Sequence, residues 1–198
     1  FHITARDADG FTNAAAEEYE VIARPDQPPV VQIENPRRNE ERTPDAVIPL
    51  QASAADDYGI AAFNLEMDRI GDKKHWQMPL VAGASPAANV TWTKTAGSTD
   101  EQRYRLDWEW SLQPMNLSPG DTLEYHAAVR DNFDLAGQHH DPVSSGILRI
   151  DIVSQQQLAD HIAEQMRQLA QRVAQVQVAQ SHTEQETRQF SHDSANKP

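Results

Sequence analysis

The chain has 198 residues, 17 of them basic and 30 acidic, and its formal net charge is −13. A field of this sign repels phosphate backbones, so we expect no nucleic-acid partner. The sequence contains no cysteine, which excludes disulfide frameworks, thiolate zinc sites and cysteine nucleophiles.

One sequence pattern occurs twice in the chain. Residues 1–10 and residues 125–134 both begin with an aromatic side chain, alternate as a strand does, and run through Arg-Asp into an acidic loop. Each copy is followed by a second strand-like run, at 19–23 and at 147–153. Such a repeat indicates one hairpin used in two consecutive β domains. We therefore expect residues 1–24 to be the terminal hairpin of a truncated domain.

The next two segments are predicted to be a linker and a complete β domain. Residues 25–29 contain three prolines, which favour a stiff, extended linker. Residues 30–153 show the period-two alternation of about seven strands with turn signals between them, as in a β-sandwich. The expected strands lie at 30–33, 47–54, 60–67, 74–80, 90–92, 104–110, 123–129 and 148–152. Charged residues 36–44 and the small residues at 81–89 are expected to be loops.

A long helix is predicted to follow the sandwich. Residues 154–190 contain no Gly or Pro and are rich in Gln and Ala, and Ser154 with Gln157 has the spacing of a capping box. Apolar residues occupy heptad positions a and d over about three heptads, as in a coiled coil: Ala159, Ile162, Met166, Leu169, Val173 and Val176. Two alternatives follow: residues 155–180 bind a protein partner or a second copy, or the helix packs on its own sandwich. Residues 191–198 are expected to be a disordered tail.

Two motifs give the sandwich a family resemblance. The Asp-Asp-Tyr-Gly turn at 56–59 and the Pro-Gly-Asp-x-Leu-x-Tyr segment that begins at Pro119 resemble bacterial immunoglobulin-like or cadherin-like repeats of large envelope proteins. Some membrane-anchored families of unknown function in this class have a Gln-rich helical stretch after the repeats. The resemblance implies an all-β Ig-like sandwich in tandem, with the first copy truncated, followed by a long C-terminal α-helix. It also implies that the Tyr125 hydroxyl is hydrogen-bonded back to the backbone.

The resemblance further implies a location outside the cytoplasm, in the periplasm or at the cell surface. The sequence has no run of about 18 apolar residues, the length that a membrane helix needs. We therefore expect membrane anchoring to come only from other parts of the full-length protein.

Acidic residues gather at the end of the predicted sandwich where the linker enters. In this architecture, the loop between the second and third strands and the loop of the final hairpin lie at that end. These loops and the linker carry Asp26, Asp56, Asp57, Asp131 and Asp134. Calcium takes six to eight oxygen ligands, which convergent carboxylates supply. The alternatives are a calcium site at the domain junction or no cofactor at all, with the aspartates capping turns.

Aromatic side chains on the predicted strands have two interpretations. Trp108 and Trp110 alternate in phase with Leu106, and Trp76 and Trp92 lie on other strands. Exposed coplanar rings would stack on sugars, whereas buried rings would fill the core. The shared phase with Leu106 favours the core.

Catalytic motifs are missing from the sequence. It has no Gly-x-Ser-x-Gly, Walker, His-Glu-x-x-His or Gly-x-Gly-x-x-Gly pattern. His139-His140-Asp141 offers imidazoles and a carboxylate, which can bind zinc or perform acid–base chemistry. Adjacent residues of a strand point in opposite directions, so both imidazoles rarely reach one ion, which favours a solvated loop.

The functional expectation is a non-enzymatic structural or interaction module, a spacer or adhesion repeat of a multidomain bacterial cell-envelope protein. The alternative is a ligand-binding module, either for calcium at the domain junction or for carbohydrate. A role as an accessory domain of an enzyme would be evident only from other parts of the protein.

Overall fold

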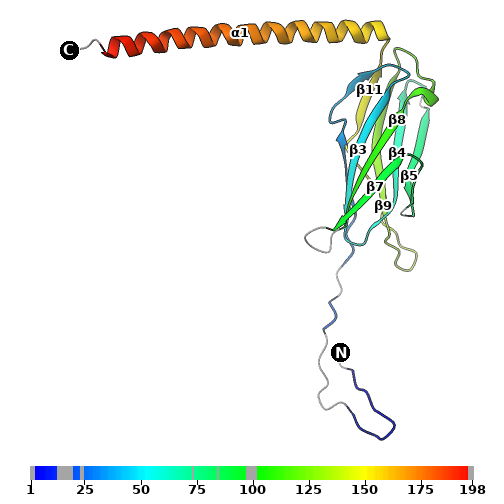
Figure 1. Ribbon diagram of the computed structural model, residues 1–198. Helices are drawn as coiled ribbons and strands as arrows, with labels where there is room; N and C mark the ends of the chain where they lie inside the picture. The colour runs from blue at the N-terminus through cyan, green and yellow to red at the C-terminus, as the bar shows by residue number, and fades with distance from the viewer. Residues whose placement is uncertain are drawn as a thin grey trace.

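The main body of the protein is a β-sandwich of two sheets, followed by one α-helix (Figure 1). The structure is a computed structural model, and it describes residues 3–12, 20–22, 25–72, 74–83, 85–96 and 102–195. Within this part of the chain, the predicted combination of a β-sandwich and a C-terminal helix is confirmed.

The first sheet has four antiparallel strands in the order β1-β3-β8-β7. These strands are β1 (Val30–Asn35), β3 (Val47–Asp56), β8 (Gln102–Ser111) and β7 (Val90–Ala96). Apolar and polar residues alternate along these strands, so the apolar side chains share the face that is turned toward the core. Along β8, Tyr104, Leu106 and Trp110 are buried, while the residues between them are more exposed.

The second sheet has the order β2-β11-β9-β4-β5-β6, and β10 also pairs with β9. Its strands are β2 (Glu40–Arg42), β11 (Leu148–Ile152), β9 (Thr122–Asp131), β4 (Ile60–Ile70), β5 (His75–Ala82), β6 (Ser85–Pro86) and β10 (Val143–Ser144). Strand β2 runs parallel to β11, whereas the other pairs are antiparallel. A 3₁₀ turn, Gln113–Met115, follows β8.

Two segments predicted as loops contain short strands. Strand β2 lies within 36–44, and β6 lies within 81–89. Both are too short or too polar to show an apolar period: β2 consists of three charged residues, all half-buried. Backbone pairing with a neighbouring strand therefore creates these strands, and side-chain pattern does not.

The core lies between the sheets and contains the aromatic residues. Trp110 is fully buried and stacks against Trp108 with ring centroids 6.3 Å apart. Trp108, Trp76 and Trp92 are partly buried and pack against the same core. These contacts confirm the core-filling interpretation of the tryptophans.

The expected tie from Tyr125 to the backbone is wrong. Its ring is buried at 1% exposure, but the hydroxyl has no hydrogen-bond partner among the described residues. Burial raises the pKa of this phenol above its ordinary value. The side chain therefore acts as a core aromatic that packs edge-on to Trp110 at 5.1 Å.

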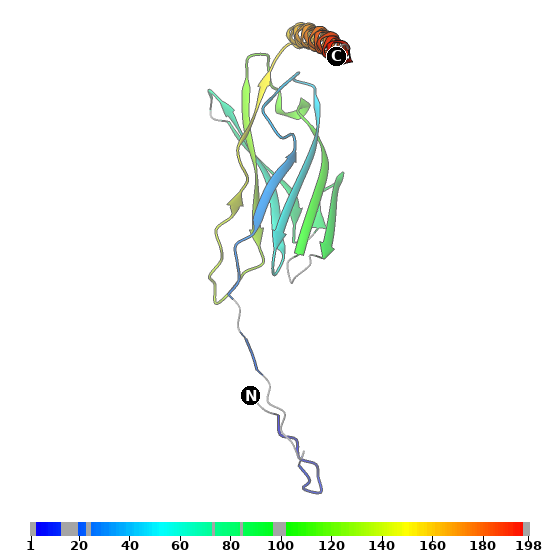
Figure 2. The same ribbon diagram turned by 90° about the vertical axis from the view of Figure 1, so that its left-hand side faces the viewer.

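The chain enters and leaves the sandwich at opposite ends. Residues 25–29 approach one end, where β1 begins, and α1 departs from the other end, after β11 (Figures 1 and 2). The turn at 56–59 and the loop that follows β9 lie at the linker end, because β3 and β9 both end there. The acidic loops are therefore remote from the helix.

Helix α1 (Gln155–Ala195) begins with the predicted capping box. The Ser154 N–H donates to Gln157 Oε1 at 2.9 Å, and the Gln157 N–H donates to Ser154 Oγ at 3.2 Å. The helix continues to Ala195, although a disordered tail is predicted from residue 191. Nothing in 181–195 breaks a helix, since this stretch has neither Gly nor Pro.

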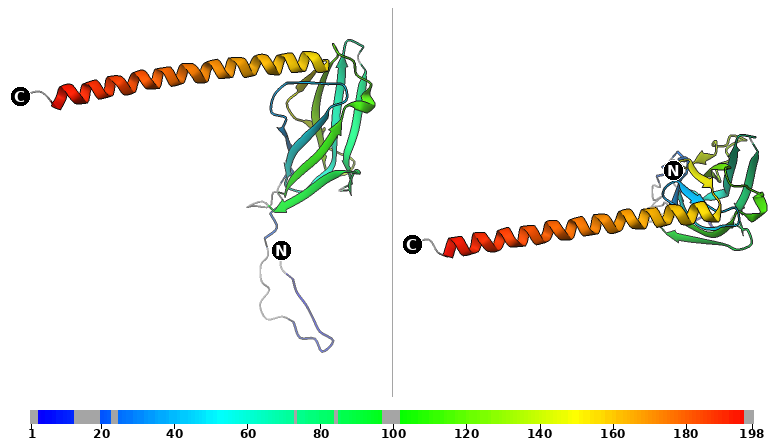
Figure 3. Two further views of the ribbon diagram at one scale, coloured as in Figure 1. Left: turned by 45° about the horizontal axis from the view of Figure 1, so that its top comes forward. Right: turned by 90° about the horizontal axis from the view of Figure 1, so that it is seen from above.

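The helix projects away from the sandwich, and Figure 3 shows that only its first turns lie beside the sheets. Five of its heptad residues are 50–62% exposed: Ile162, Met166, Leu169, Val173 and Val176. The alternative in which the helix packs on its own sandwich is therefore wrong. Among the described residues, no helix has both the length and the apolar character needed to cross a membrane.

The N-terminal segment contains a tight turn. Residues Arg6 and Thr12 form an antiparallel bridge, and the Asp7 carboxylate accepts hydrogen bonds from the N–H groups of Asp9 and Phe11 at 3.0 and 2.8 Å. Residues 20–22 form no strand. The predicted second strand at 19–23 extends beyond the described residues at both ends, and the truncated-domain interpretation stays a prediction.

Candidate functional site

The ends of two strands bring buried carboxylates to the linker end of the sandwich. Asp56 is the last residue of β3 and Asp131 the last of β9, and they are only 4% and 3% exposed. The two following loops are joined, because the Asn132 N–H donates to the Gly59 carbonyl at 3.0 Å. This bond, together with the pairing of Ile60 with Asp131, keeps the two strand ends beside each other.

Asp56 uses only one of its two oxygens to cap its turn. Oδ2 accepts hydrogen bonds from the Tyr58 N–H, at 2.9 Å, and from the Gly59 N–H. Oδ1 is buried and has no hydrogen-bond partner in the described part of the chain. Burial raises the pKa of Asp56, the two N–H groups lower it, and the charges of Asp57 and Asp131 raise it further.

The linker adds a third carboxylate, from Asp26. Its Oδ1 is buried without a hydrogen-bond partner among the described residues, and the same holds for Asp57 Oδ1. Burial, the carboxyl group of Asp57 within hydrogen-bonding reach, and the charges of Asp56 and Asp131 raise the pKa of Asp26 from 3.8 to about 6. The linker thus places the carboxylate of Asp26 beside other negatively charged carboxylates.

Asp131 binds a histidine from the loop after β9. Its Oδ1 accepts a hydrogen bond from the Phe133 N–H at 3.1 Å, and its Oδ2 lies 2.6 Å from Nδ1 of His140. The His140 ring stacks on Phe133 with centroids 4.3 Å apart and planes 11° apart. The hydrogen bond with Asp131 raises the pKa of His140 above its ordinary value.

These side chains form a group with the dimensions of a metal site. One ligand atom each from Asp26, Asp131 and His140 lie within 4.8 Å of one another. The charges of Asp56 and Asp57 also act on this group, since both raise the pKa of Asp26. Four of the five predicted acidic residues thus converge, namely Asp26, Asp56, Asp57 and Asp131. Asp134 does not join them: it is exposed, and its Oδ1 accepts a hydrogen bond from the Gly137 N–H at 3.3 Å.

His140 is the site residue for which the sequence allows a zinc ligand but favours a solvated loop. A solvated loop is predicted for His139-His140-Asp141, and His139 and Asp141 are exposed as expected, whereas His140 is half-buried. Nδ1 of His139 lies 3.1 Å from the Phe133 carbonyl oxygen. The loop after β9 folds back so that His140 lies over the strand end, nine residues from Asp131. The one sequence signal is an aromatic residue, Phe133, placed to stack on the imidazole.

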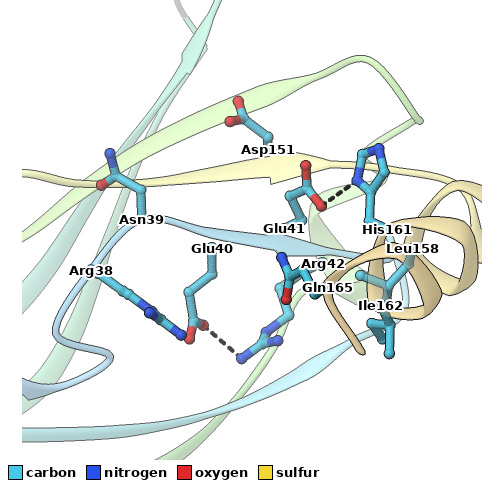
Figure 4. Close-up of a pocket in the computed structure, with 10 residues that line it drawn as sticks. All are labelled: Arg38, Asn39, Glu40, Glu41, Arg42, Asp151, Leu158, His161, Ile162 and Gln165. Atoms are coloured by element: carbon cyan, nitrogen blue, oxygen red, sulfur yellow. Dashed lines mark hydrogen bonds and ion pairs between the residues drawn. The ribbon is translucent and has the colours of Figure 1, made fainter. Parts of the chain in front are cut away.

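A second concavity lies at the opposite end, where α1 meets β2. This groove of about 630 Å³ is lined by both signs of charge (Figure 4). Glu40 pairs with Arg42 at 2.6 Å, and Glu41 pairs with His161 of the helix at 2.7 Å. Because both of these glutamates are paired within the groove, and one of them with the helix, the groove is best explained as the seat of the helix.

Comparison with known proteins assigns this chain to no family. No known protein family matches this sequence, and no curated protein is significantly similar to it.

Proposed function

We propose that this chain is a non-enzymatic spacer module of a multidomain bacterial cell-envelope protein. One observation carries the proposal: the linker and the helix leave the sandwich from opposite ends (Figures 1 and 2). A β-sandwich is held together by sheet hydrogen bonds and a continuous core, so it separates its two connections by its own length. Whatever precedes the linker is thereby kept apart from whatever follows β11.

The strand order supports an immunoglobulin-like identity for the sandwich. The order β1-β3-β8-β7 corresponds to strands A-B-E-D of that fold, and β11-β9-β4-β5 corresponds to G-F-C-C′. Tyr125 departs from that fold in one respect: its hydroxyl has no hydrogen-bond partner among the described residues, whereas the corresponding tyrosine of the fold bonds back to the backbone. On the repeated sequence pattern, we further propose that residues 1–24 are the terminal hairpin of a preceding copy.

The proposed location is outside the cytoplasm, with membrane anchoring through other parts of the protein. This rests on the resemblance to envelope repeats. Adhesion through carbohydrate is less well supported, because the tryptophans that would stack on sugars pack against the core.

Helix α1 gives the spacer a surface for assembly. Its heptad residues are exposed, and a helix of this pattern buries them most completely against a second helix of the same pattern. We propose that this helix associates with a second copy or with a partner helix.

The spacer role is tested by measuring the distance between the two ends. The chain has no cysteine, so the double variant Gln27→Cys/Gln155→Cys can be spin-labelled at those two sites alone. We expect one narrow distance distribution by pulsed electron paramagnetic resonance, because a folded sandwich lies between the labels.

A control pair at one end calibrates the result. Gln27→Cys/Asp134→Cys places both labels at the linker end, because Asp134 lines a hollow together with linker residues Pro25 and Asp26. This pair should give a much shorter distance. A broad distribution for the first pair, or one as short as that of the control pair, would contradict the spacer role.

A further inference from the structure

We propose that the linker end of the sandwich binds one divalent metal ion through the carboxylates of Asp26 and Asp131 and the imidazole of His140. The ion would fasten the linker to the sandwich. This inference goes beyond the spacer role and does not depend on it, since a spacer can function without a metal.

The geometry of three separate segments carries the first step. Asp26 comes from the linker, Asp131 from the end of β9 and His140 from the loop that follows, and their ligand atoms lie within 4.8 Å of one another. That spacing is what a single ion with bonds of about 2.0–2.4 Å requires of its ligands. Asp131 is fixed by its bond to the Phe133 N–H, and His140 by its stacking on Phe133.

A buried oxygen without a partner is the second, independent observation. Asp56 is 4% exposed, and its Oδ1 has no hydrogen-bond partner among the residues that the structure describes. The charge of Asp56 contributes to raising the pKa of both Asp26 and His140, so its carboxyl group lies near theirs. A buried acceptor without a partner is unfavourable, and more so when it is charged. Turn capping accounts for Oδ2 and leaves Oδ1 unexplained.

The charge balance points to a cation. Four carboxylates, those of Asp26, Asp56, Asp57 and Asp131, act on one another here, and the imidazole of His140, which is cationic only when protonated, is bound to Asp131. A proton on Nδ1 of His140 forms a hydrogen bond with only one carboxylate oxygen, Asp131 Oδ2. A divalent ion that replaces this proton, with the proton released to solvent, would neutralise two charges and approach several oxygens at once.

The mixture of donors selects the metal. Zinc and manganese accept imidazole nitrogen together with carboxylate oxygen, whereas calcium takes oxygen ligands. We therefore expect Zn²⁺ and Mn²⁺ to bind more tightly than Ca²⁺, which differs from the calcium site that the acidic residues alone suggest. Asp57 and Asp56 would contribute charge beside the ion.

The position of the site is tested with Mn²⁺, whose unpaired electrons broaden nearby nuclear magnetic resonance signals. In the intact chain, amide signals of residues 56–59 and 131–140 should broaden at the lowest Mn²⁺ concentrations. Signals of β2 and α1, which hold other acidic and histidine side chains, should persist. Uniform broadening, or broadening that begins at α1, would overturn the proposal.

Affinity for Zn²⁺ is tested by titration calorimetry on matched variants. Asp26→Asn and His140→Gln should each weaken binding by about tenfold or more, the loss that even an outer partner causes. His139→Gln and Asp134→Asn are the controls: both residues are exposed in the same loop, and both variants should bind as the intact chain does. Circular dichroism should be unchanged in all four variants.

Three results would overturn the assignment. They are no binding of Zn²⁺ or Mn²⁺, equal binding by the Asp26 and His140 variants and the intact chain, and binding of Ca²⁺ that is tighter than that of Zn²⁺. Asp131 is left unchanged in this test, because it is buried and its substitution would disturb folding as well as binding.

Discussion

Gly59 lies in the turn after Asp56, at a position that leaves no room for a side chain. Its φ is +117°, a conformation that side chains with a Cβ rarely adopt. A Cβ there would lie 3.0 Å from Asn132 Nδ2 and 3.1 Å from Tyr104 Oη. Tyr104 donates a hydrogen bond to Gln102 at 2.7 Å, so it cannot easily move away.

Gly59→Ala should lower the free energy of unfolding by about 1–3 kcal/mol from strain alone, with crowding in addition. Gly71→Ala is the matched control, because Gly71 has a φ of +116° but no described atom lies within 4 Å of the place that a Cβ would take. Urea unfolding of both variants separates strain from crowding. Equal losses would show that the contacts around Gly59 relax without cost.

Tyr125 shows that a side chain can sit where a motif predicts and yet do something else. Because its buried hydroxyl has no partner among the described residues, the hydroxyl contributes a desolvation cost without a compensating bond. Tyr125→Phe should therefore leave the free energy of unfolding unchanged or raise it by up to about 1 kcal/mol.

Tyr104→Phe is the contrasting change, since the Tyr104 hydroxyl donates to Gln102. This variant should lose about 1 kcal/mol, the usual worth of a hydrogen bond in a protein. Thermal or urea unfolding of the two variants tests the difference. A loss of stability in Tyr125→Phe as large as that in Tyr104→Phe would mean that the Tyr125 hydroxyl does form a bond in solution.

At the scale of elements, α1 is attached to the sandwich by a titratable contact. Nδ1 of His161 lies 2.7 Å from Glu41 Oε2 on β2 (Figure 4). The hydrogen bond and charge of Glu41, with a further contribution from Asp160, raise the pKa of His161 above its ordinary value of 6.5. A raised pKa in the folded state means that this contact stabilises attachment below about pH 6.5 and is lost as the pH rises through the folded pKa.

A pH titration of the His161 imidazole by nuclear magnetic resonance should give a pKa above 6.5 in the intact chain. Glu41→Gln should lower that pKa toward its ordinary value, because the charge-assisted bond is removed. Glu40→Gln is the control, since Glu40 pairs with Arg42. The same His161 pKa in all three proteins would show that the helix does not rest on β2 in solution.

The elements differ in how far sequence could predict them, and the reason is physical. Strands such as β3 and β8 alternate between core and solvent, so their pattern is visible, and α1 has a visible capping box. Strand β2 exists only because its backbone pairs with β11, more than 100 residues away, and no local pattern records that. The role of His140 could not be predicted for the same reason, because its place depends on how the loop after β9 returns to Asp131.

The positions of the carboxylates at the acidic end are easier to predict than the position of His140, because Asp56 and Asp131 are fixed by the ends of their strands. Asp56 and Asp131 end strands that finish at the same end of the sandwich, and the linker must enter beside them. Asp134 lies three residues beyond its strand, where a local turn with Gly137 decides its position. Residues at strand ends are therefore predictable from topology, and residues farther into a loop are not.

At the scale of the whole molecule, the sandwich separates two ends with different chemistry. The linker end is acidic and has buried carboxylates, whereas the helix end has paired charges and a long exposed helix. A single exposed helix gains little from its own apolar residues in water, and packing against another helix supplies most of the stability of such a segment. The assembly surface is therefore expected at the helix end.

Sedimentation of the intact chain should show a species larger than a monomer that dissociates on dilution, and deletion of residues 155–198 should leave a folded monomer. Leu169→Glu places a charge at a d position that is 56% exposed, and should abolish the larger species. Gln171→Glu adds the same charge two residues away, at heptad position f outside the stripe, and should leave association intact. If both substitutions abolish the larger species, net charge governs association and the heptad stripe does not. If neither does, the contacts between copies lie outside the heptad stripe.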